Sequence, residues 1–439
     1  MNVLCIDNDG VGLSFCWRCV LAGHKVRWYV KPKPCNNKQT GDGFGIEKIG
    51  NWVSSVMWAD LVFATTNDDY MERLDSLKSR AKIFAPSKKS ADLEVKRADG
   101  MKFLESHGID VPSYKTFPSL KEAESYVQKK PGRYVFKTLG DHEDKSLSYC
   151  SKDPADMVAR LQRWQQMNMN PKGEVMLQEF IPGIEIGVSR WMGSKGWVGP
   201  PNENFEFKKL MAGDIGPNTG EMGTVMKYTG ESKLFDEVLK PMTEGIRKLG
   251  HLGDIDINCI VDEKGKAWPL EFTSRPGWPA FNIMMSEHKG DPAKWMLDAI
   301  NGKDTLQVTD EVAIGVVIAQ PDFPYGKMKE EEKAGMPIYG VTEKNQKYIH
   351  PQAVKMDKLP DMEGDKVVEK TMWATAGDYL AVVTGMGKTI KQAQKRVYKT
   401  VDDICVANML YRSDIGDRLQ ESLVELHKHG FGVSFEFGA

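Results

Sequence analysis

The chain has 439 residues, of which 41% are hydrophobic, so it is long enough for about three domains with their own cores. Its 59 basic and 61 acidic residues give a formal net charge of −2, which excludes a global field that attracts nucleic acid or an anionic membrane. No apolar stretch reaches the roughly 18 residues of a membrane span, and no export signal precedes the first strand. The seven scattered cysteines indicate reduced thiols, so we expect a cytoplasmic protein.

Residues 1–92 are predicted to form a doubly wound parallel α/β domain. The runs "NVLCID" and "KVRWYV" predict two buried strands joined by a helix, and "WADLVFAT" and "AKIFAP" predict two more strands around a polar helix. The first turn carries Gly10 and Gly12, but Phe15 stands at the third glycine position of a dinucleotide site and Asp9 stands where phosphate would lie. These residues argue against nicotinamide or flavin binding.

The rest of the chain is predicted to form two further domains, 93–310 and 311–439. Alternating runs such as "YVFKTL", "EVMLQEFI" and "IEIGVSRWMG" predict antiparallel strands, with a small lid subdomain at about 113–185. "DIDINCIVDEKGKAWPLEF" predicts a hairpin that turns at 263–266. After residue 310, "VAIGVVIA" and "YLAVVTGMG" predict strands and "IKQAQKRVYKTVDDICVANML" predicts an amphipathic helix, so this domain is mixed α/β.

Three polar side chains follow one another at alternate positions near the end of the hairpin. On a strand, Glu271, Thr273 and Arg275 project from the same face, and they suit a site for Mg²⁺, a polyphosphate and a carboxylate substrate. The alternative is a surface strand with an exposed ion pair. "DIDIN" at 254–258 imitates the start of a calcium loop, but Cys259 replaces the required glycine, which excludes an EF-hand.

Other charged residues suggest a nucleotide site. Glu179 and Glu185 flank a turn between strands and can accept hydrogen bonds from adenine and ribose. Lys137 lies inside an expected strand, where an ammonium group needs an anion such as phosphate. Each of these residues could equally belong to a structural salt bridge.

Several motifs in fixed order resemble one enzyme family. They are "VLCIDNDGVGLSFCWR" (3–18), "FAPSKKSADLEVKRADGMKFLESHGIDVPSY" (84–114), "GPNTGEMG" (216–223), "LEFTSRPGWPA" (270–280), "YLAVVTGMGKTIKQAQKRVYKTVDDI" (379–404) and "YRSDIG" (411–416). Together they resemble the ATP-grasp ligases and, within them, the phosphoribosylamine–glycine ligases, whose motif reads "GPNTGGMG" where Glu221 stands here. The resemblance implies an ATP-grasp fold.

The resemblance also implies a reaction and its residues. ATP phosphorylates the carboxylate of a small amino acid such as glycine, an amine attacks the acyl phosphate, and Mg²⁺, with Mn²⁺ as an alternative, neutralises the phosphates. By position, the residues that would bind the nucleotide are Arg97, Lys137, Lys145, Glu179 and Glu185. Those that would bind the metal are Glu271 and Thr273, and Thr273 replaces the family's asparagine. Arg275 matches the arginine that holds the amino-acid carboxylate, and a glycine-rich loop is expected to bring Asp214, Asn218 and Thr219 to the reacting groups.

The N-terminal motifs depart most from the family. "DGVGLS" (9–14) and "ATTNDD" (64–69) stand where the family has segments that contact phosphoribosylamine, and Asp7 and Asp9 are expected to repel a phosphate. The lid segment "KTLGDHEDKSL" (137–147) also loses glycines and gains acids, which weakens the expected nucleotide affinity. We therefore expect a ligase whose acceptor is a neutral or cationic amine.

Three alternatives remain at this point. The chain could be a phosphoribosylamine–glycine ligase with an altered phosphate pocket, or a nucleotide-binding protein without catalysis. The acceptor could also be a modified base in nucleic acid, for which "KPKPCNNK" (31–38) and "SLKSRAK" (76–82) are the local basic segments, although we interpret both as solvated loop charges. We expect a monomer.

Overall fold

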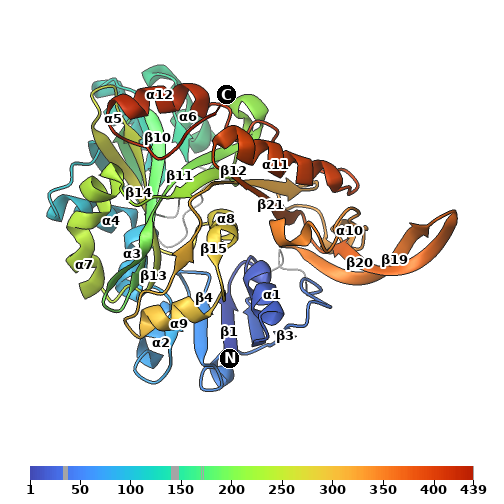
Figure 1. Ribbon diagram of the computed structural model, residues 1–439. Coiled ribbons are helices and arrows are strands. Elements are labelled where there is room, and N and C mark those ends of the chain that lie inside the picture. Colours follow the sequence, from blue (N-terminus) through green and yellow to red (C-terminus); the bar gives the residue numbers. More distant parts are fainter. Residues whose placement is uncertain (33–37, 140–147, 170, 172, 439) are drawn as a thin grey trace.

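The computed structural model describes residues 1–32, 38–139, 148–169, 171 and 173–438, and its N-terminal part is a parallel sheet (Figure 1). The strand order is β3-β2-β1-β4-β5, with every pairing parallel. The elements are β1 (Asn2–Asp7), α1 (Leu13–Leu21), β2 (Lys25–Val30), β3 (Glu47–Lys48), β4 (Leu61–Ala64), α2 (Met71–Leu77), β5 (Ile83–Phe84), α3 (Lys88–Val95) and α4 (Arg97–Ser106). This confirms the predicted α/β fold class of residues 1–92.

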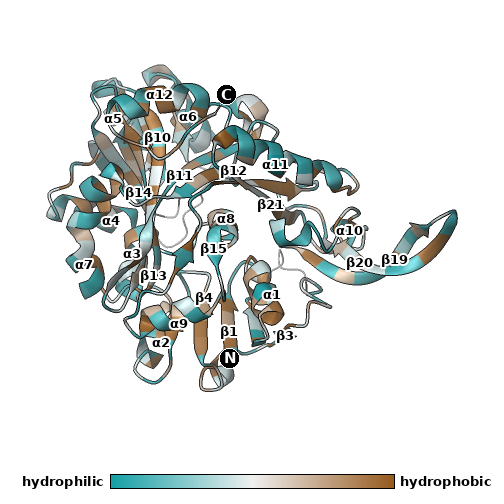
Figure 2. Cartoon of the chain, in the orientation of Figure 1, coloured by the Kyte–Doolittle hydropathy of each residue, from teal (hydrophilic) through white to brown (hydrophobic). Residues whose placement is uncertain are grey.

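Both faces of this sheet are covered. Val3 and Cys5 of β1 pack in one cluster with Phe15 and Cys16 of α1, whereas the intervening Leu4 and Ile6 pack in another cluster with α2 and α3. Figure 2 shows β1 and β4 as strongly hydrophobic strands, as expected for strands buried on both sides. Since β1 pairs with β2 on one side and β4 on the other, the strand order reverses there, which is where open α/β sheets place ligands.

A smaller sheet, in the order β6-β9-β7-β8, lies at the opposite end of the molecule (Figure 1). It comprises β6 (Tyr114–Phe117), β7 (Tyr134–Thr138), β8 (Tyr149–Cys150) and β9 (Val175–Glu179), with α5 (Leu120–Lys129) and α6 (Pro154–Gln166). Phe136 and Leu177 of this sheet share a core with Val127 and Leu161 of the two helices. Residues 114–179 therefore form a compact unit with its own core.

The largest sheet has the order β14-β13-β10-β11-β12-β17-β21-β18. Its strands are β10 (Ile184–Gly193), β11 (Gly196–Met211), β12 (Ile215–Tyr228), β13 (Gly253–Val261), β14 (Ala267–Thr273), β17 (Val312–Ala319), β18 (Ile349–Pro351) and β21 (Tyr379–Gly387). The sheet crosses the expected domain boundary at residue 310, because β12 pairs with β17. The predicted hairpin 254–271 is confirmed as β13 and β14.

Helices and short strands cover or extend this sheet. They are α7 (Thr243–Lys248), α8 (Ala280–Glu287), β15 (His288–Lys289), α9 (Lys294–Ile300), β16 (Gln307–Val308), α10 (Glu330–Lys333), α11 (Ile390–Asp403) and α12 (Leu419–Lys428). Val397 of α11 packs among the buried residues of the main core with Val383 of β21. No helix in the described part of the chain combines the length and apolar character needed to cross a membrane.

The expected glycine-rich loop is wrong in form, because most of it is strand. β11 and β12 make a long antiparallel hairpin, and the motif at 216–223 lies within β12. Only the tip turns, where Gly213, Asp214 and Gly216 have φ values of 73°, 54° and 88°. Register shifts between Phe207 and Met211 loosen the pairing near the tip. The glycines therefore serve a turn and an irregular strand rather than a free loop.

A second hairpin, β19 (Val354–Glu363) with β20 (Lys366–Thr375), projects from the body as an arm (Figure 1). Its base is bound to the N-terminal domain: Gly41 N donates to Val354 O at 2.8 Å, and Met356 N donates to Asp42 O at 2.8 Å. These bonds hold the N-terminal and C-terminal parts of the chain against each other.

Candidate functional site

A cavity of about 250 Å³ lies on the face of the large sheet beside α4 and α8. Three strands contribute alternate residues to it, as strands with one face toward a cavity must. The lining residues are Arg97, Ser148, Asn204, Glu206, Lys208, Asn218, Thr219, Gly220, Glu221, Asp254, Asp256, Asn258, Glu271, Thr273, Arg275, Gly277, Trp278, Ala280 and Met284. The prediction that Glu271, Thr273 and Arg275 share a face is confirmed.

Gly187 of β10 leaves room for two amide side chains at the base of this cavity. A Cβ at that position would lie 2.5 Å from Asn204 Oδ1 and 2.7 Å from Asn258 Oδ1, so any side chain would displace both amides. The oxygens of these two amides are buried and have no hydrogen-bond partner. A buried amide oxygen without a donor is a free ligand for a cation or a hydrogen-bonding substrate.

Lys208 lies between carboxylates on the acidic side of the cavity and forms ion pairs with them. Its ammonium group lies 2.8 Å from Glu185 and 2.9 Å from Glu206. Burial opposes the charge, but Glu206, Glu185 and Glu271 outweigh it and raise the pKa of Lys208 well above its usual value. Glu221 is the opposite case, because burial and then the neighbouring Glu206 raise the pKa of its carboxyl. A permanent cation is thus surrounded by carboxylates, at least one of which holds its proton readily.

The donor set fits Mg²⁺, which prefers hard oxygen ligands and completes its shell with phosphates. Asn258 pairs in register with Glu271 across β13 and β14, so the orphaned Oδ1 of Asn258 lies beside that carboxylate. Glu271 forms an ion pair with Arg97. Among the described residues, no cluster of three or more His, Cys, Asp or Glu side chains could hold a metal by itself. Protein ligands here would be few, with Glu271, Asn258 and Thr273 as the candidates.

Arg275 is oriented by a neighbouring carboxylate. Its guanidinium lies 3.3 Å from Glu94 and donates to Pro276 O at 3.0 Å. Glu94 in turn accepts hydrogen bonds from Ser274 N and Asn67 Nδ2, both at 2.7 Å. Asn67 belongs to the loop after β4, so the N-terminal domain and the cavity wall meet at Glu94.

Not all of the residues predicted from sequence come together. Arg97, Asn218, Thr219, Glu271, Thr273 and Arg275 line the cavity, and Glu185 reaches it through Lys208. Lys137, 8% exposed on β7, donates to Leu270 O at 3.3 Å, next to Glu271. Lys145 lies outside the described residues.

Two other predicted residues lie away from the cavity. Asp214, at the tip of the β11–β12 hairpin, is 2.8 Å from the Arg412 guanidinium and 3.5 Å from that of Arg418, so it joins the hairpin to the C-terminal part of the chain. Glu179 ends β9 and lines a separate hollow with Arg133 and Phe180. Neither side chain is among those that line the central cavity.

Sequence reasoning missed several polar residues of the cavity, among them Glu206, Lys208, Asp256 and Asn258. The signal for Asp256 and Asn258 was the alternation in "DIDIN", which we considered only as a calcium loop. Burial, and then Glu206, raises the pKa of Asp256 to about 7. Nothing in "FEFKK" distinguished Lys208 from a surface lysine, because its partner Glu185 comes from another strand.

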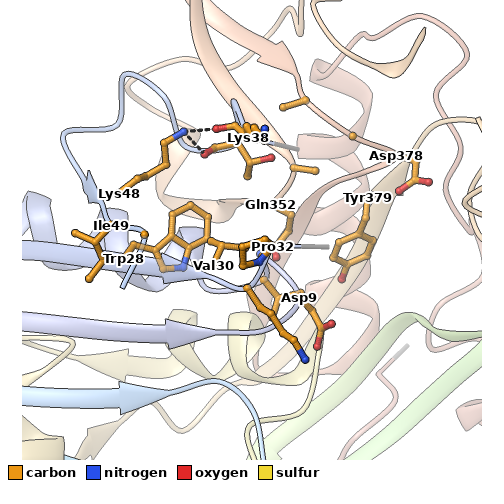
Figure 3. A pocket seen from close by; sticks show the side chains of 18 residues that line it. Asp9, Trp28, Val30, Pro32, Lys38, Lys48, Ile49, Gln352, Asp378 and Tyr379 are labelled. Atoms are coloured by element: carbon orange, nitrogen blue, oxygen red, sulfur yellow. Dashed lines mark hydrogen bonds between the residues drawn. The ribbon is translucent and has the colours of Figure 1, made fainter. Parts of the chain in front are cut away.

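A second, larger cleft of about 640 Å³ lies between the N-terminal sheet and the C-terminal part of the chain (Figure 3). We call it the front cleft. Figure 3 shows Trp28 and Ile49 on one wall and Gln352 and Tyr379 on the other. Its lining is Asp9, Gly10, Val11, Trp28, Val30, Lys31, Pro32, Lys38, Thr40, Lys48, Ile49, Gly50, Gln352, Ala353, Ala376, Gly377, Asp378 and Tyr379.

Asp7 does not line either cavity, contrary to the expectation that it faces the acceptor. It ends β1 with 0% of its surface exposed. Burial raises the pKa of Asp7, and hydrogen bonds from Gly12, Thr65, Asp9 and Trp28 oppose that rise. All of these partners donate, which is the arrangement that an ionised carboxylate requires.

Two stretches of the chain match families of known proteins. Residues 99–277 match the phosphoribosylglycinamide synthetase ATP-grasp (A) domain family, and residues 313–418 match the C domain family of the same synthetase. A phosphoribosylamine–glycine ligase of Neisseria meningitidis serogroup B is 27% identical over 350 residues, covering 77% of this chain and 78% of the relative. That of Streptococcus pneumoniae is 26% identical over 410 residues, covering 88% and 92%.

A solved structure supports the same fold. The crystal structure of phosphoribosylamine–glycine ligase from Thermotoga maritima superposes with a TM-score of 0.70 at 20% identity, covering 95% of this chain and 100% of that one. An N5-carboxyaminoimidazole ribonucleotide synthetase in complex with ADP gives a TM-score of 0.59 at 14% identity. At these identities the likeness extends to the fold.

Proposed function

Because this chain belongs to the ATP-grasp family of phosphoribosylglycinamide synthetases, we propose that it joins the carboxylate of glycine, or of a similarly small amino acid, to an amine while ATP is converted to ADP and phosphate. One observation carries the proposal. A single cavity brings together a candidate metal ligand, Glu271, with Arg97, Arg275 and the polar groups of Asn218 and Thr219. A nucleotide-binding scaffold has no need for all of these.

The reaction follows from what these groups can hold. A carboxylate oxygen of the amino acid attacks the γ-phosphorus of ATP and ADP leaves, which gives an acyl phosphate. The amine nitrogen then attacks the acyl carbon, phosphate leaves with the electrons of the C–O bond, and the nitrogen loses a proton to form the amide. Bound Mg²⁺ would neutralise phosphate charge, held by Glu271 and Asn258.

The protein residues position and neutralise rather than react covalently. Arg275 offers a planar fork of donors that matches the amino-acid carboxylate. Arg97 is paired with Glu271 and can turn to a phosphate oxygen when a metal takes that carboxylate. Lys137, held beside Glu271, supplies a second positive charge. These charges act where solvent is limited, so each stabilises the transferring phosphoryl group more than it would in water.

The proposal can be tested without knowing the acceptor. Hydroxylamine is small enough to reach an acyl phosphate directly and converts it to a hydroxamate. We expect the purified chain to release ADP and form glycine hydroxamate only when ATP, Mg²⁺ and glycine are all present. Glu271→Gln should lower the rate at least about 100-fold, since it removes a ligand charge at the metal. Glu263→Gln, an exposed carboxylate at the turn of the same hairpin, should leave the rate unchanged.

The same assay separates the alternatives. Binding of Mg·ATP, seen as a thermal shift, without any hydroxamate would identify a nucleotide-binding protein and refute the ligase proposal. The relatives that are named phosphoribosylamine–glycine ligases suggest phosphoribosylamine as the natural acceptor. The residues around the front cleft give separate information on the identity of the acceptor.

A further inference from the structure

At the end of strand β1, the carboxylate of Asp7 occupies a site formed by several hydrogen-bond donors. Asp7 Oδ1 accepts from Asp9 N and Gly10 N, both at 3.1 Å, and from Thr65 Oγ1 at 2.9 Å. Asp7 Oδ2 accepts from Gly12 N at 2.7 Å and from Trp28 Nε1 at 3.1 Å. Five donors from the turn and two neighbouring strands therefore converge on one buried carboxylate.

This is the position at which an open parallel sheet would otherwise bind an anion. The N–H groups between a strand and the following helix point outward at the reversal of strand order and ordinarily receive phosphate. Here Asp7 already accepts hydrogen bonds from three N–H groups of the turn before α1, those of Asp9, Gly10 and Gly12. Gly12 is part of the arrangement, because a Cβ there would lie 2.9 Å from Asp7 Oδ2. The carboxylate and the glycine fit together, and the N–H groups of Asp9, Gly10 and Gly12 are occupied before a phosphate could reach them.

Carboxylates also occupy the hydrogen-bond donors near the neighbouring loop after β4. Asp68 accepts from Asn8 Nδ2 and, at 2.5 Å, from Thr66 Oγ1. Asp69 accepts from Asn8 Nδ2 at 3.1 Å and forms an ion pair with Lys31. Donors that could have turned to a phosphate are held by these carboxylates.

Among the residues that the structure describes, the front cleft beside this turn carries no excess of positive charge. Lys31 is paired with Asp69, and Lys48 is paired with Asp42. The lining also contains Lys38 together with the carboxylates of Asp9 and Asp378, and Asp378 pairs with Lys333, so four lysines stand against four carboxylates. Much of the remaining lining is apolar or aromatic: Val11, Trp28, Val30, Pro32, Ile49 and Tyr379. Its volume of about 640 Å³ suits a small molecule.

The front cleft also adjoins the central cavity. Tyr379 lines the cleft and Glu221 lines the cavity. Burial raises the pKa of Tyr379, and the charge of Glu221 raises it further, so the two groups are close enough to interact. They also lie in one sheet, since β12 pairs with β17 and β17 with β21. An acceptor bound in the front cleft would thus approach the acyl group past Glu221.

We infer that the acceptor of this ligase enters the front cleft as a neutral or cationic amine that carries no phosphate group, because Asp7 permanently fills the anion cradle at the end of β1. This inference rests on the proposed function, from which it takes the need for an acceptor. It concerns only the second substrate, so it can fail while the ligase chemistry stands.

The test compares two amines that differ only in the phosphate. Ribosylamine and 5-phosphoribosylamine form from ammonia with ribose or ribose 5-phosphate, and ammonia alone serves as the blank. With ATP, Mg²⁺ and glycine present, we expect 5-phosphoribosylamine to give kcat/KM for ADP release no higher than ribosylamine does. A higher value for the phosphorylated amine in the unmodified protein would overturn the inference, whether or not any variant folds.

A pair of variants tests the cause. Asp7→Gly empties the cradle, and we expect it to raise kcat/KM for 5-phosphoribosylamine at least about 10-fold, the effect of one well-made phosphate contact. Glu72→Gln removes an exposed carboxylate of α2 that belongs neither to the cradle nor to the front cleft, and it should give no such gain. Equal gains in both variants, or none in folded Asp7→Gly, would overturn the assignment to Asp7. Hydroxamate formation in each variant shows that the ligase chemistry itself is intact.

Discussion

Replacing Arg275 by lysine probes the amino-acid site directly. The guanidinium lies on the cavity wall, with 24% of the side chain exposed, and is fixed by Glu94 and by the carbonyl of Pro276. Lysine keeps the charge but loses the planar fork, so a substrate carboxylate would lose one of two parallel charge-assisted hydrogen bonds. Such a bond contributes about 1.5–3 kcal/mol, and partial exposure places the effect toward the lower end. We therefore expect the KM for glycine to rise about 10-fold to 30-fold.

The measurement is hydroxamate formation at varied glycine and saturating Mg·ATP. The KM for ATP should stay within about twofold, because Arg275 is assigned to the amino acid and not to the nucleotide. Arg247→Lys is the matched control, since Arg247 is exposed and pairs only with Glu244 three residues earlier on α7. An unchanged KM for glycine together with a raised KM for ATP would show that Arg275 binds phosphate, and the assignment would be wrong.

Three further predictions concern carboxylates and their partners. Burial raises the pKa of Glu203 to about 7 from 4.5, so the unfolded chain ionises first and stability falls by about 3 kcal/mol as pH rises through that window. Glu203→Gln should therefore raise Tm at about pH 8 but not at about pH 4.5. Arg412→Met should lower the free energy of unfolding in urea by about 1–3 kcal/mol, because the partly exposed Asp214 and Asp414 lose the charge-assisted hydrogen bonds of Arg412. Asp7→Asn should still reject 5-phosphoribosylamine in the ADP-release assay.

Much of the fold followed from local pattern. Buried strands such as 2–7 and 312–319 are continuous apolar runs, and the wall formed by Glu271, Thr273 and Arg275 needed only the period of a strand. These features depend on neighbours in sequence, so one sequence is sufficient to predict them.

What could not be predicted depends on contacts between distant segments. Lys208 acquires its role from Glu185, 23 residues earlier on the preceding strand β10, and Asp214 is held by Arg412 from the far end of the chain. The glycine-rich motif was expected to be a loop because its composition disfavours strands, yet pairing with β11, and with β17 from Gly223 onward, brings β12 into the sheet. Tertiary pairing overrides weak local propensity here.

Asp7 shows why the same conclusion can have two physical causes. From sequence, a carboxylate near the acceptor site was expected to repel phosphate by charge. In the structure it is fully buried and occupies the N–H groups that a phosphate would use. Charge repulsion disappears when the carboxylate becomes a neutral amide, whereas occupancy persists because the amide fills the same space and retains an acceptor oxygen. Rejection of phosphate by Asp7→Asn combined with acceptance by Asp7→Gly would identify occupancy as the cause, and acceptance by both would identify charge.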